Sequence, residues 1–275
     1  MAARRVRAGD VELEVLEEGA GGRPLLAVHG FTGAKEDFAD APERLAADGW
    51  HVVAPDLRGH GGSDHPEGRS SYSLDRFTSD MSALVDALGW ERFVLVGHSM
   101  GGMVAQLLAL RAPARVRALA LLNTGPGPPE GYAPGLVDLG RQLVTQGGMP
   151  LLVDVQRQME SDLGSPAHRR LLAERAGYRE FNYAKTLAAS PDMWLALVDE
   201  MFTQPDRSEA LAALAVPTLV LVGEQDDAFL GPSKRLGEAL PGARLVVIAD
   251  AGHLPQFEAP EEWWSALHGF LSELR

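Results

Sequence analysis

Residues 93–106 read FVLVGHSMGGMVAQ, and this stretch indicates how the chain is organised. An apolar run rich in valine, Val94 to Val96, precedes a turn, and apolar residues with helical spacing follow it. The turn, residues 97–101, fits the pattern G-x-S-x-G. Small residues on both sides of a strained apex let neighbouring backbone approach closely. The stretch therefore predicts a strand, a sharp turn with Ser99 at its apex, and a helix whose positive N-terminal end faces the Ser99 oxygen.

Composition limits the classes of protein to which the chain can belong. Its 275 residues are 45% hydrophobic and 23% charged, enough for one large α/β domain with an insertion or for two small domains. The formal net charge of −13 argues against a general affinity for nucleic acid or for an anionic membrane surface. The chain contains no cysteine, which excludes disulfides, thiolate chemistry and cysteine-based metal sites.

The first fifteen residues contain basic side chains but no apolar core of the kind found in secretory signals. No apolar run approaches the ~20 residues that a membrane-spanning helix needs. We therefore expect a cytoplasmic protein without membrane insertion. The sequence leaves open whether it is a monomer or a homodimer.

Segments with strand and helix patterns alternate along most of the chain. A turn at Gly9-Asp10 between two alternating segments predicts a hairpin. The alternation predicts an α/β fold, a mostly parallel eight-stranded sheet flanked by helices. The expected strands are 4–8, 11–17, 25–28, 51–54, 94–96, 116–122, 217–222 and 244–248, and the expected helices are 35–48, 74–88, 100–111, 233–240 and 260–274.

A helical insertion of roughly eighty residues interrupts this alternation. It follows the proline- and glycine-rich segment 125–129 and has helical spacing in several pieces. The predicted division is a first core part at 1–124, a helical insertion at 125–210 and a second core part at 211–275. The insertion follows the C-terminal end of a strand, which is the edge where open α/β sheets bind ligands.

A serine hydroxyl needs a base to become a good nucleophile, and the base needs a carboxylate to orient it. With a serine on a strand-to-helix turn, the partners are expected in the order serine, acid, histidine, each after a strand. His253 follows the strand 244–248 and is the predicted base. Three acids follow the strand 217–222, and this reasoning leaves the choice among Glu224, Asp226 and Asp227 open.

An oxyanion that forms beside Ser99 needs two backbone N–H donors. The residue after the nucleophile, Met100, is expected to supply one of them. Phe31, in the loop after the strand 25–28, is expected to supply the other. These are roles for the amides of the two residues rather than for their side chains.

Five segments together resemble the α/β-hydrolase superfamily over nearly the full chain: HGFTG at 29–33, DLRGHGGSD at 56–64, GHSMGG at 97–102, GEQDD at 223–227 and AGH at 251–253. In this family the acid usually stands three residues after the glycine that ends its strand, which selects Asp226. The resemblance also implies that the insertion is a cap over Ser99. Within the superfamily the chain looks most like capped serine esterases, including enol-lactonases.

The resemblance implies a serine hydrolase that cleaves a carboxylic ester or lactone of a small, largely apolar substrate without a metal or organic cofactor. Ser99 argues against haloalkane dehalogenases and epoxide hydrolases, which have aspartate there. One alternative is a hydrolase that breaks a carbon–carbon bond in a vinylogous diketone acid, although such enzymes commonly have asparagine where this chain has His98. Another is a ligand-binding or receptor protein with slow turnover. Perhydrolase or haloperoxidase activity is a possible side reaction.

Specificity is expected to come from the insertion, whose methionines and aromatic residues suit an apolar pocket. The candidate pocket residues are His29, Phe181, Trp194 and Leu254. No cluster of arginine or lysine marks a site for a highly charged substrate, and Arg58 and Arg69 are expected at the surface or in loops.

Overall fold

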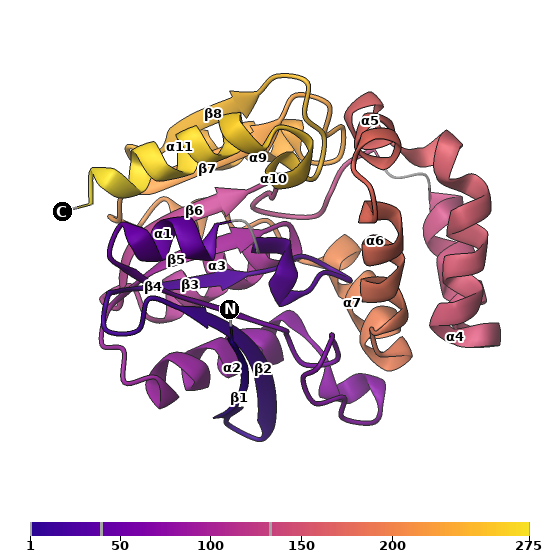
Figure 1. The fold of residues 1–275 in the computed structure, drawn as a ribbon, viewed down its shortest axis with the longest axis horizontal. Helices are drawn as coiled ribbons and strands as arrows, with labels where there is room; N and C mark the ends of the chain where they lie inside the picture. Colours follow the sequence, from indigo (N-terminus) through magenta and orange to yellow (C-terminus); the bar gives the residue numbers. More distant parts are fainter. Residues whose placement is uncertain (1, 39–40, 132–133, 275) are drawn as a thin grey trace.

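The computed structural model describes residues 2–38, 41–131 and 134–274. One eight-stranded sheet forms its centre, and a group of helices lies beyond the C-terminal ends of its parallel strands (Figure 1). The strands are β1 (Ala2–Ala8), β2 (Val11–Glu18), β3 (Arg23–Val28), β4 (Trp50–Pro55), β5 (Phe93–His98), β6 (Val116–Leu122), β7 (Thr218–Gly223) and β8 (Arg244–Ile248).

The strand order is β1-β2-β4-β3-β5-β6-β7-β8. The pairs β1–β2 and β2–β4 are antiparallel, and every later pair is parallel. The predicted hairpin joins β1 to β2, and Gly9 takes the positive φ of 64° that its tight turn requires. The prediction of a mostly parallel eight-stranded α/β sheet is confirmed.

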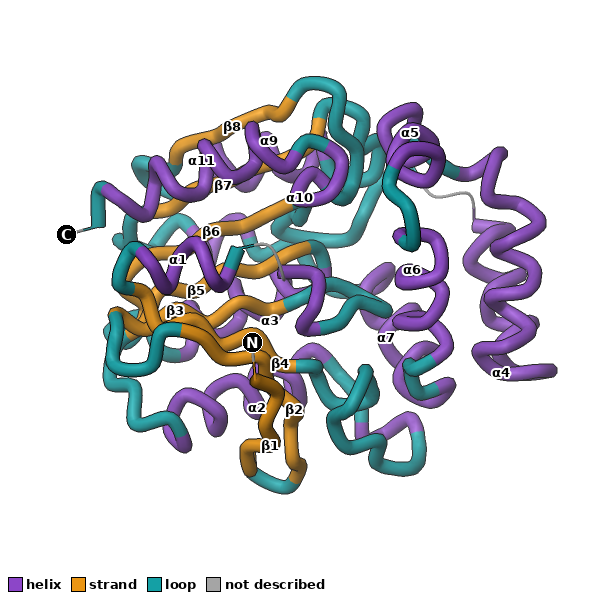
Figure 2. The backbone as a smooth tube through the Cα atoms, in the orientation of Figure 1, coloured by secondary structure: helices purple, strands orange, loops and turns teal. Residues whose placement is uncertain are grey.

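Both faces of the sheet are buried because alternate residues of each central strand meet different helices. In β3, Leu26 and Val28 belong to one apolar core, while Leu25 and Ala27 belong to the other. The first core includes residues of α2 (Leu74–Ala87), α3 (Met100–Arg111) and α9 (Leu230–Ala239). The second includes residues of α1 (Pro42–Ala47) and α11 (Pro260–Ser272), as the layers in Figure 2 show.

In its described residues, the insertion between β6 and β7 contains four longer helices and one short one. They are α4 (Pro134–Leu163), α5 (Pro166–Glu174), α6 (Tyr178–Leu187), α7 (Pro191–Thr203) and α8 (Ser208–Leu211). Ser-Pro pairs begin two of them, and the Ser165 and Ser190 side chains accept hydrogen bonds from the first turns of α5 and α7. Within α4 the helical backbone breaks at Gly148, whose φ is 66° and ψ is −162°.

Two expectations about the core change in the structure. The segment predicted as one helix at 35–48 contains a 3-10 turn, η1 (Lys35–Phe38), and then α1, which begins at Pro42. Proline fits the first turn of a helix, where its missing N–H has no intrahelical partner. Positions 39 and 40 of this segment lie outside the described residues.

Arg58 lies in a loop, one of its two expected places, but it is buried there rather than at the surface. Its side chain is 2% exposed, and it donates to both carboxylate oxygens of Asp80 at 2.6 Å. It also donates to Asp10 at 2.7 Å. A guanidinium tolerates burial when planar carboxylates satisfy its donors, which the residue type alone did not indicate.

Among the helices within the described ranges, none combines the length and the apolar composition that crossing a membrane demands.

Candidate active site

Ser99 sits at the apex of the predicted turn between β5 and α3, with φ 53° and ψ −120°. This is a strained conformation for a residue with a side chain, and close backbone packing holds it in place. A Cβ added at Gly97 would lie 2.4 Å from the Gly101 carbonyl oxygen, and one added at Gly101 would lie 2.2 Å from the Val28 carbonyl oxygen. The two glycines of the motif are therefore required by the turn itself.

The structure brings Ser99, His253 and Asp226 into one hydrogen-bonded chain. His253 Nε2 lies 3.0 Å from Ser99 Oγ, and His253 Nδ1 lies 2.8 Å from Asp226 Oδ2. The three residues follow β5, β7 and β8, whose C-terminal ends meet at one edge of the parallel sheet. Glu224 and Asp227, the other two candidate acids, are exposed, whereas Asp226 is buried against the histidine.

The electrostatic interaction between His253 and Asp226 favours a proton on His253. Burial opposes charge on the imidazole, but the carboxylates of Asp226 and Glu258 raise the pKa of His253 above its ordinary value of 6.5. Burial also opposes charge on Asp226, but interactions with His253 and Asn123 lower the pKa of that carboxyl. An ionised Asp226 can therefore hold the Nδ1–H tautomer, which leaves Nε2 free to accept a proton from Ser99.

The two predicted amide donors lie on segments that pack around Ser99. Met100 is the first residue of α3, and the N–H groups of a first helical turn have no intrahelical partner. Phe31 lies in the loop after β3, and a Cβ added at its neighbour Gly30 would be 3.0 Å from Ser99 Cβ. The loop and the helix end therefore lie close to the Ser99 side chain, where an oxyanion would form.

A cavity of about 1160 Å³ opens at Ser99 and His253 between the sheet edge and the inserted helices. Two of the predicted pocket residues, Trp194 and Leu254, line it. Apolar side chains of α4 and α7 supply much of its wall: Leu136, Val137, Leu139, Leu143, Leu152, Val155, Met159, Val198, Met201 and Phe202.

The other two predicted pocket residues do not line this cavity. His29 is fully buried, with Nδ1 2.8 Å from the Gly30 carbonyl oxygen and Nε2 accepting from the Leu57 amide at 3.0 Å. Burial lowers the pKa of its imidazole, consistent with a neutral ring that braces the Phe31 loop. Phe181 packs instead against Tyr178 and Phe257, with ring centroids 6.1 and 6.2 Å away.

Two site residues were missed by sequence reasoning. Asn123 Nδ2 donates to Asp226 Oδ2 at 2.7 Å and to the Gly252 carbonyl at 3.0 Å, and its backbone has a positive φ of 47°. His98 Nε2 donates to the His253 carbonyl at 2.8 Å, and burial lowers the pKa of His98 to about 4, so the ring is neutral. For Asn123 the available signal was its position directly after β6, at the sheet edge that carries Ser99.

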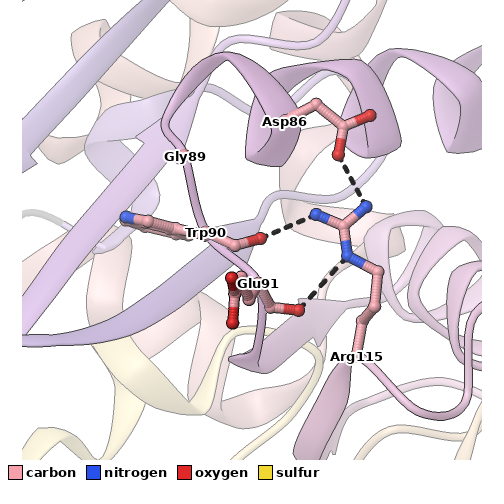
Figure 3. Close-up of a pocket in the computed structure, with 5 residues that line it drawn as sticks. All are labelled: Asp86, Gly89, Trp90, Glu91 and Arg115. Atoms are coloured by element: carbon pink, nitrogen blue, oxygen red, sulfur yellow. Dashed lines mark hydrogen bonds and ion pairs between the residues drawn. The ribbon is translucent and has the colours of Figure 1, made fainter.

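A second hollow, of about 480 Å³, lies far from this edge and is lined by Asp86, Gly89, Trp90, Glu91 and Arg115. It lies where β5 and β6 begin, whereas Ser99 follows the end of β5. The Arg115 guanidinium donates to Asp86 at 2.6 Å and to the Trp90 carbonyl at 2.7 Å, and Figure 3 marks both contacts with dashed lines. These contacts connect the segments that precede β5 and β6, so they are structural rather than part of a reactive group.

Histidine, aspartate and glutamate side chains in the described ranges form no group of three or more that could hold a metal ion.

Comparison with known proteins places the chain in a family. The family model described as alpha/beta hydrolase fold matches residues 23–260. Epoxide hydrolase A of Mycobacterium tuberculosis is 30% identical over 314 residues, covering 98% of this chain and 97% of that protein. A putative 2-succinyl-6-hydroxy-2,4-cyclohexadiene-1-carboxylate synthase of Bacillus subtilis is 27% identical, with 96% of each chain covered. The structure of a thermophilic esterase from Thermogutta terrifontis matches with a TM-score of 0.83 and 28% identity, covering 100% of this chain and 99% of that one. This chain is a hydrolase and belongs to the α/β-hydrolase family.

Proposed function

We propose that the protein is a serine hydrolase that cleaves carboxylic esters or lactones of small, largely apolar molecules through an acyl-enzyme. One observation carries the proposal: the chain of hydrogen bonds from Asp226 through His253 to Ser99 ends in a large cavity with mainly apolar walls. Serine, histidine and aspartate in this arrangement are the groups that acyl transfer needs.

In the first step Ser99 Oγ attacks the ester carbonyl carbon while its proton moves to His253 Nε2. Asp226 holds the imidazole in the reactive tautomer and stabilises the imidazolium that forms. The amides of Phe31 and Met100 donate to the negatively charged carbonyl oxygen. His253 then gives its proton to the leaving alkoxide, the carbon–oxygen bond breaks, and the acyl group stays on Ser99.

The second step repeats the first with water as the nucleophile. His253 accepts a proton from the water as its oxygen attacks the acyl carbon, and Ser99 leaves with that proton. The carboxylic acid is released, or the hydroxy acid where the substrate is a lactone. All the proton transfers in this scheme use His253 Nε2, which is 3.0 Å from Ser99 Oγ.

We propose that the helices α4 to α7 form a cap that selects the substrate. Their side chains line the cavity together with those of the sheet edge. The volume of about 1160 Å³ exceeds the roughly 300–1000 Å³ of ordinary small-molecule pockets. The expected substrates therefore include esters whose acyl or alcohol part is larger than an acetyl or ethyl group.

The similarity to an epoxide hydrolase makes epoxide opening a second candidate function, but the nucleophile favours ester cleavage. A carboxylate that opens an epoxide forms an ester, which water can hydrolyse to regenerate the enzyme. A serine that opened an epoxide would form an ether, which this site has no means to cleave. The presence of Ser99 at the apex therefore supports acyl transfer.

Hydrolysis of p-nitrophenyl esters of graded acyl length, with Ser99→Ala in parallel, tests the proposal. Wild-type turnover should fall by roughly 10⁴-fold or more in the variant, because members of a triad act as a unit. Equal rates in both proteins would contradict it. In that case consumption of a vinylogous diketone acid would indicate carbon–carbon cleavage, and tight binding without turnover would indicate a receptor.

A further inference from the structure

Glu258, the last residue of α10 (Pro255–Glu258), lies directly behind the His253 loop, and its side chain is completely buried. Its Oε2 accepts hydrogen bonds from the amides of Gly252 at 2.6 Å and Leu254 at 3.1 Å. These are the two residues on either side of His253. One carboxylate oxygen therefore binds the main chain on both sides of His253.

Further contacts hold the segment 252–254 in place. The Gly252 carbonyl accepts from Asn123 and the His253 carbonyl accepts from His98, so the same short segment is held from several sides. A Cβ added at Gly252 would lie 2.5 Å from Ser165 Oγ and 3.3 Å from Glu258 Oε1. The chain is thus pressed against Glu258 with no space for a side chain between them.

We propose that Glu258 is a positioning residue for His253, which fixes the backbone of the imidazole through two amides and stabilises the imidazolium through its negative charge. The inference rests on the proposed role of His253 as the base. Burial of a carboxylate is costly unless hydrogen bonds and nearby positive charge compensate it. The two amides give the first compensation, and the imidazolium formed during each step gives the second.

The charged and titratable groups around Glu258 are compatible with this role. His168 of α5 places Nδ1 3.9 Å from Glu258 Oε1, and the Arg170 guanidinium donates to the Glu258 carbonyl at 3.4 Å. Tyr178 and Asp226 lie near enough to interact electrostatically with the carboxylate. Burial raises the pKa of Glu258, while its bonds to the Gly252 and Leu254 amides and the charge of His253 oppose this rise.

The His253 ring has polar and titratable neighbours of its own. Asp226 is bonded to Nδ1, Ser99 to Nε2, and the neutral His98 ring lies with its centroid 5.0 Å away. Burial lowers the pKa of His253, and Asp226 followed by Glu258 raises it. Removing the Glu258 charge while retaining an acceptor oxygen should therefore make the imidazole a weaker base.

The decisive measurement is the pKa of His253 by NMR titration of the imidazole ring in wild type, Glu258→Gln and Glu261→Gln. The His253 signal is assigned from its loss in His253→Gln. Glu261 is the matched control, because it stands three residues further along and its side chain is 78% exposed. We expect the His253 pKa to fall by about one unit in Glu258→Gln and to stay at the wild-type value in Glu261→Gln. An unchanged pKa in Glu258→Gln overturns the proposal.

Kinetics with a p-nitrophenyl ester separate the positioning role from general stability. In Glu258→Gln the acid limb of kcat/KM should move to lower pH while the plateau stays within about tenfold of wild type. In Glu258→Ala, which leaves both amides without an acceptor, kcat should fall about 10²-fold with KM nearly unchanged. If Glu258→Ala does not fold, the glutamine variant alone decides. If the wild type hydrolyses no ester, the proposed function fails, while the NMR titration still tests Glu258.

Discussion

The proton on His253 is the single-residue property on which the proposed chemistry depends. His253 must be neutral to accept a proton from Ser99, and the nearby carboxylates raise its pKa above 6.5. Activity should therefore fall as the pH drops through that raised pKa, so the midpoint of the acid limb of kcat/KM should lie above pH 6.5. A pH–rate profile measures it, and a midpoint well below this value would contradict the assignment of His253 as the base.

Asp226 gives the second prediction at this scale. Asp226→Asn removes the charge that raises the His253 pKa and offers an amide where Nδ1–H needs an acceptor. We expect kcat to fall by about 10⁴-fold, because the wrong tautomer then faces Ser99. Asp227→Asn is the matched control, since Asp227 is adjacent in the chain but exposed. Equal losses in the two variants would mean that the acid has been misassigned.

Single residues also show how far the sequence could predict the site. Ser99 and His253 each follow their own strand, so local pattern and chain order were enough to select them as candidates, and the structure places their side chains 3.0 Å apart. Asn123 and Glu258 contact this site from other segments: both bind the Gly252 peptide, and Asn123 also donates to the Asp226 carboxylate. Contacts of this kind depend on the three-dimensional approach of distant loops, which periodicity does not encode.

At the scale of whole elements, the strands of the sheet were predictable, and the attachment of the insertion was not. Buried parallel strands such as β5 and β7 are short, nearly continuous apolar runs, so the local sequence is enough to recognise them. The insertion has helical spacing, but nothing in that spacing says which core element each helix contacts. The structure shows one such contact, an ion pair between Lys185 of α6 and Asp37 of η1, with the two side chains 7% and 3% exposed.

This ion pair should matter for the stability of the folded protein. Lys185→Met leaves Asp37 buried without its cation, which should lower the free energy of unfolding by about 3 kcal/mol. The double variant Lys185→Met/Asp37→Leu should recover part of that loss, because no uncompensated charge remains.

Arg141→Met is the control: Arg141 of α4 pairs with Asp199 of α7 at 2.6 Å, but the side chains are 38% and 51% exposed. Its cost should stay below about 1 kcal/mol. Urea denaturation measures all three, and equal losses in the two single variants would refute the argument.

The charge of the whole molecule bears on which esters can reach Ser99. The formal net charge is −13, and the described residues that line the cavity include five carboxylates and no lysine or arginine. The carboxylates are Glu130, Glu224, Asp226, Asp227 and Glu258. A substrate with its own carboxylate would have to lose water in this cavity without a cation to pair with it. Neutral esters are therefore expected to be the better substrates.

A matched set of esters tests this expectation directly. p-Nitrophenyl butyrate and p-nitrophenyl hydrogen succinate have acyl chains of equal carbon number, and methyl p-nitrophenyl succinate controls for the added polar group. We expect kcat/KM for the hydrogen succinate to be at least about tenfold below that of its methyl ester. The gap should narrow as the ionic strength rises, because salt screens the repulsion between exposed charges. Faster cleavage of the hydrogen succinate would mean that a cation reaches the bound substrate, which would return carboxylated lactones and diketone acids to the list of substrates.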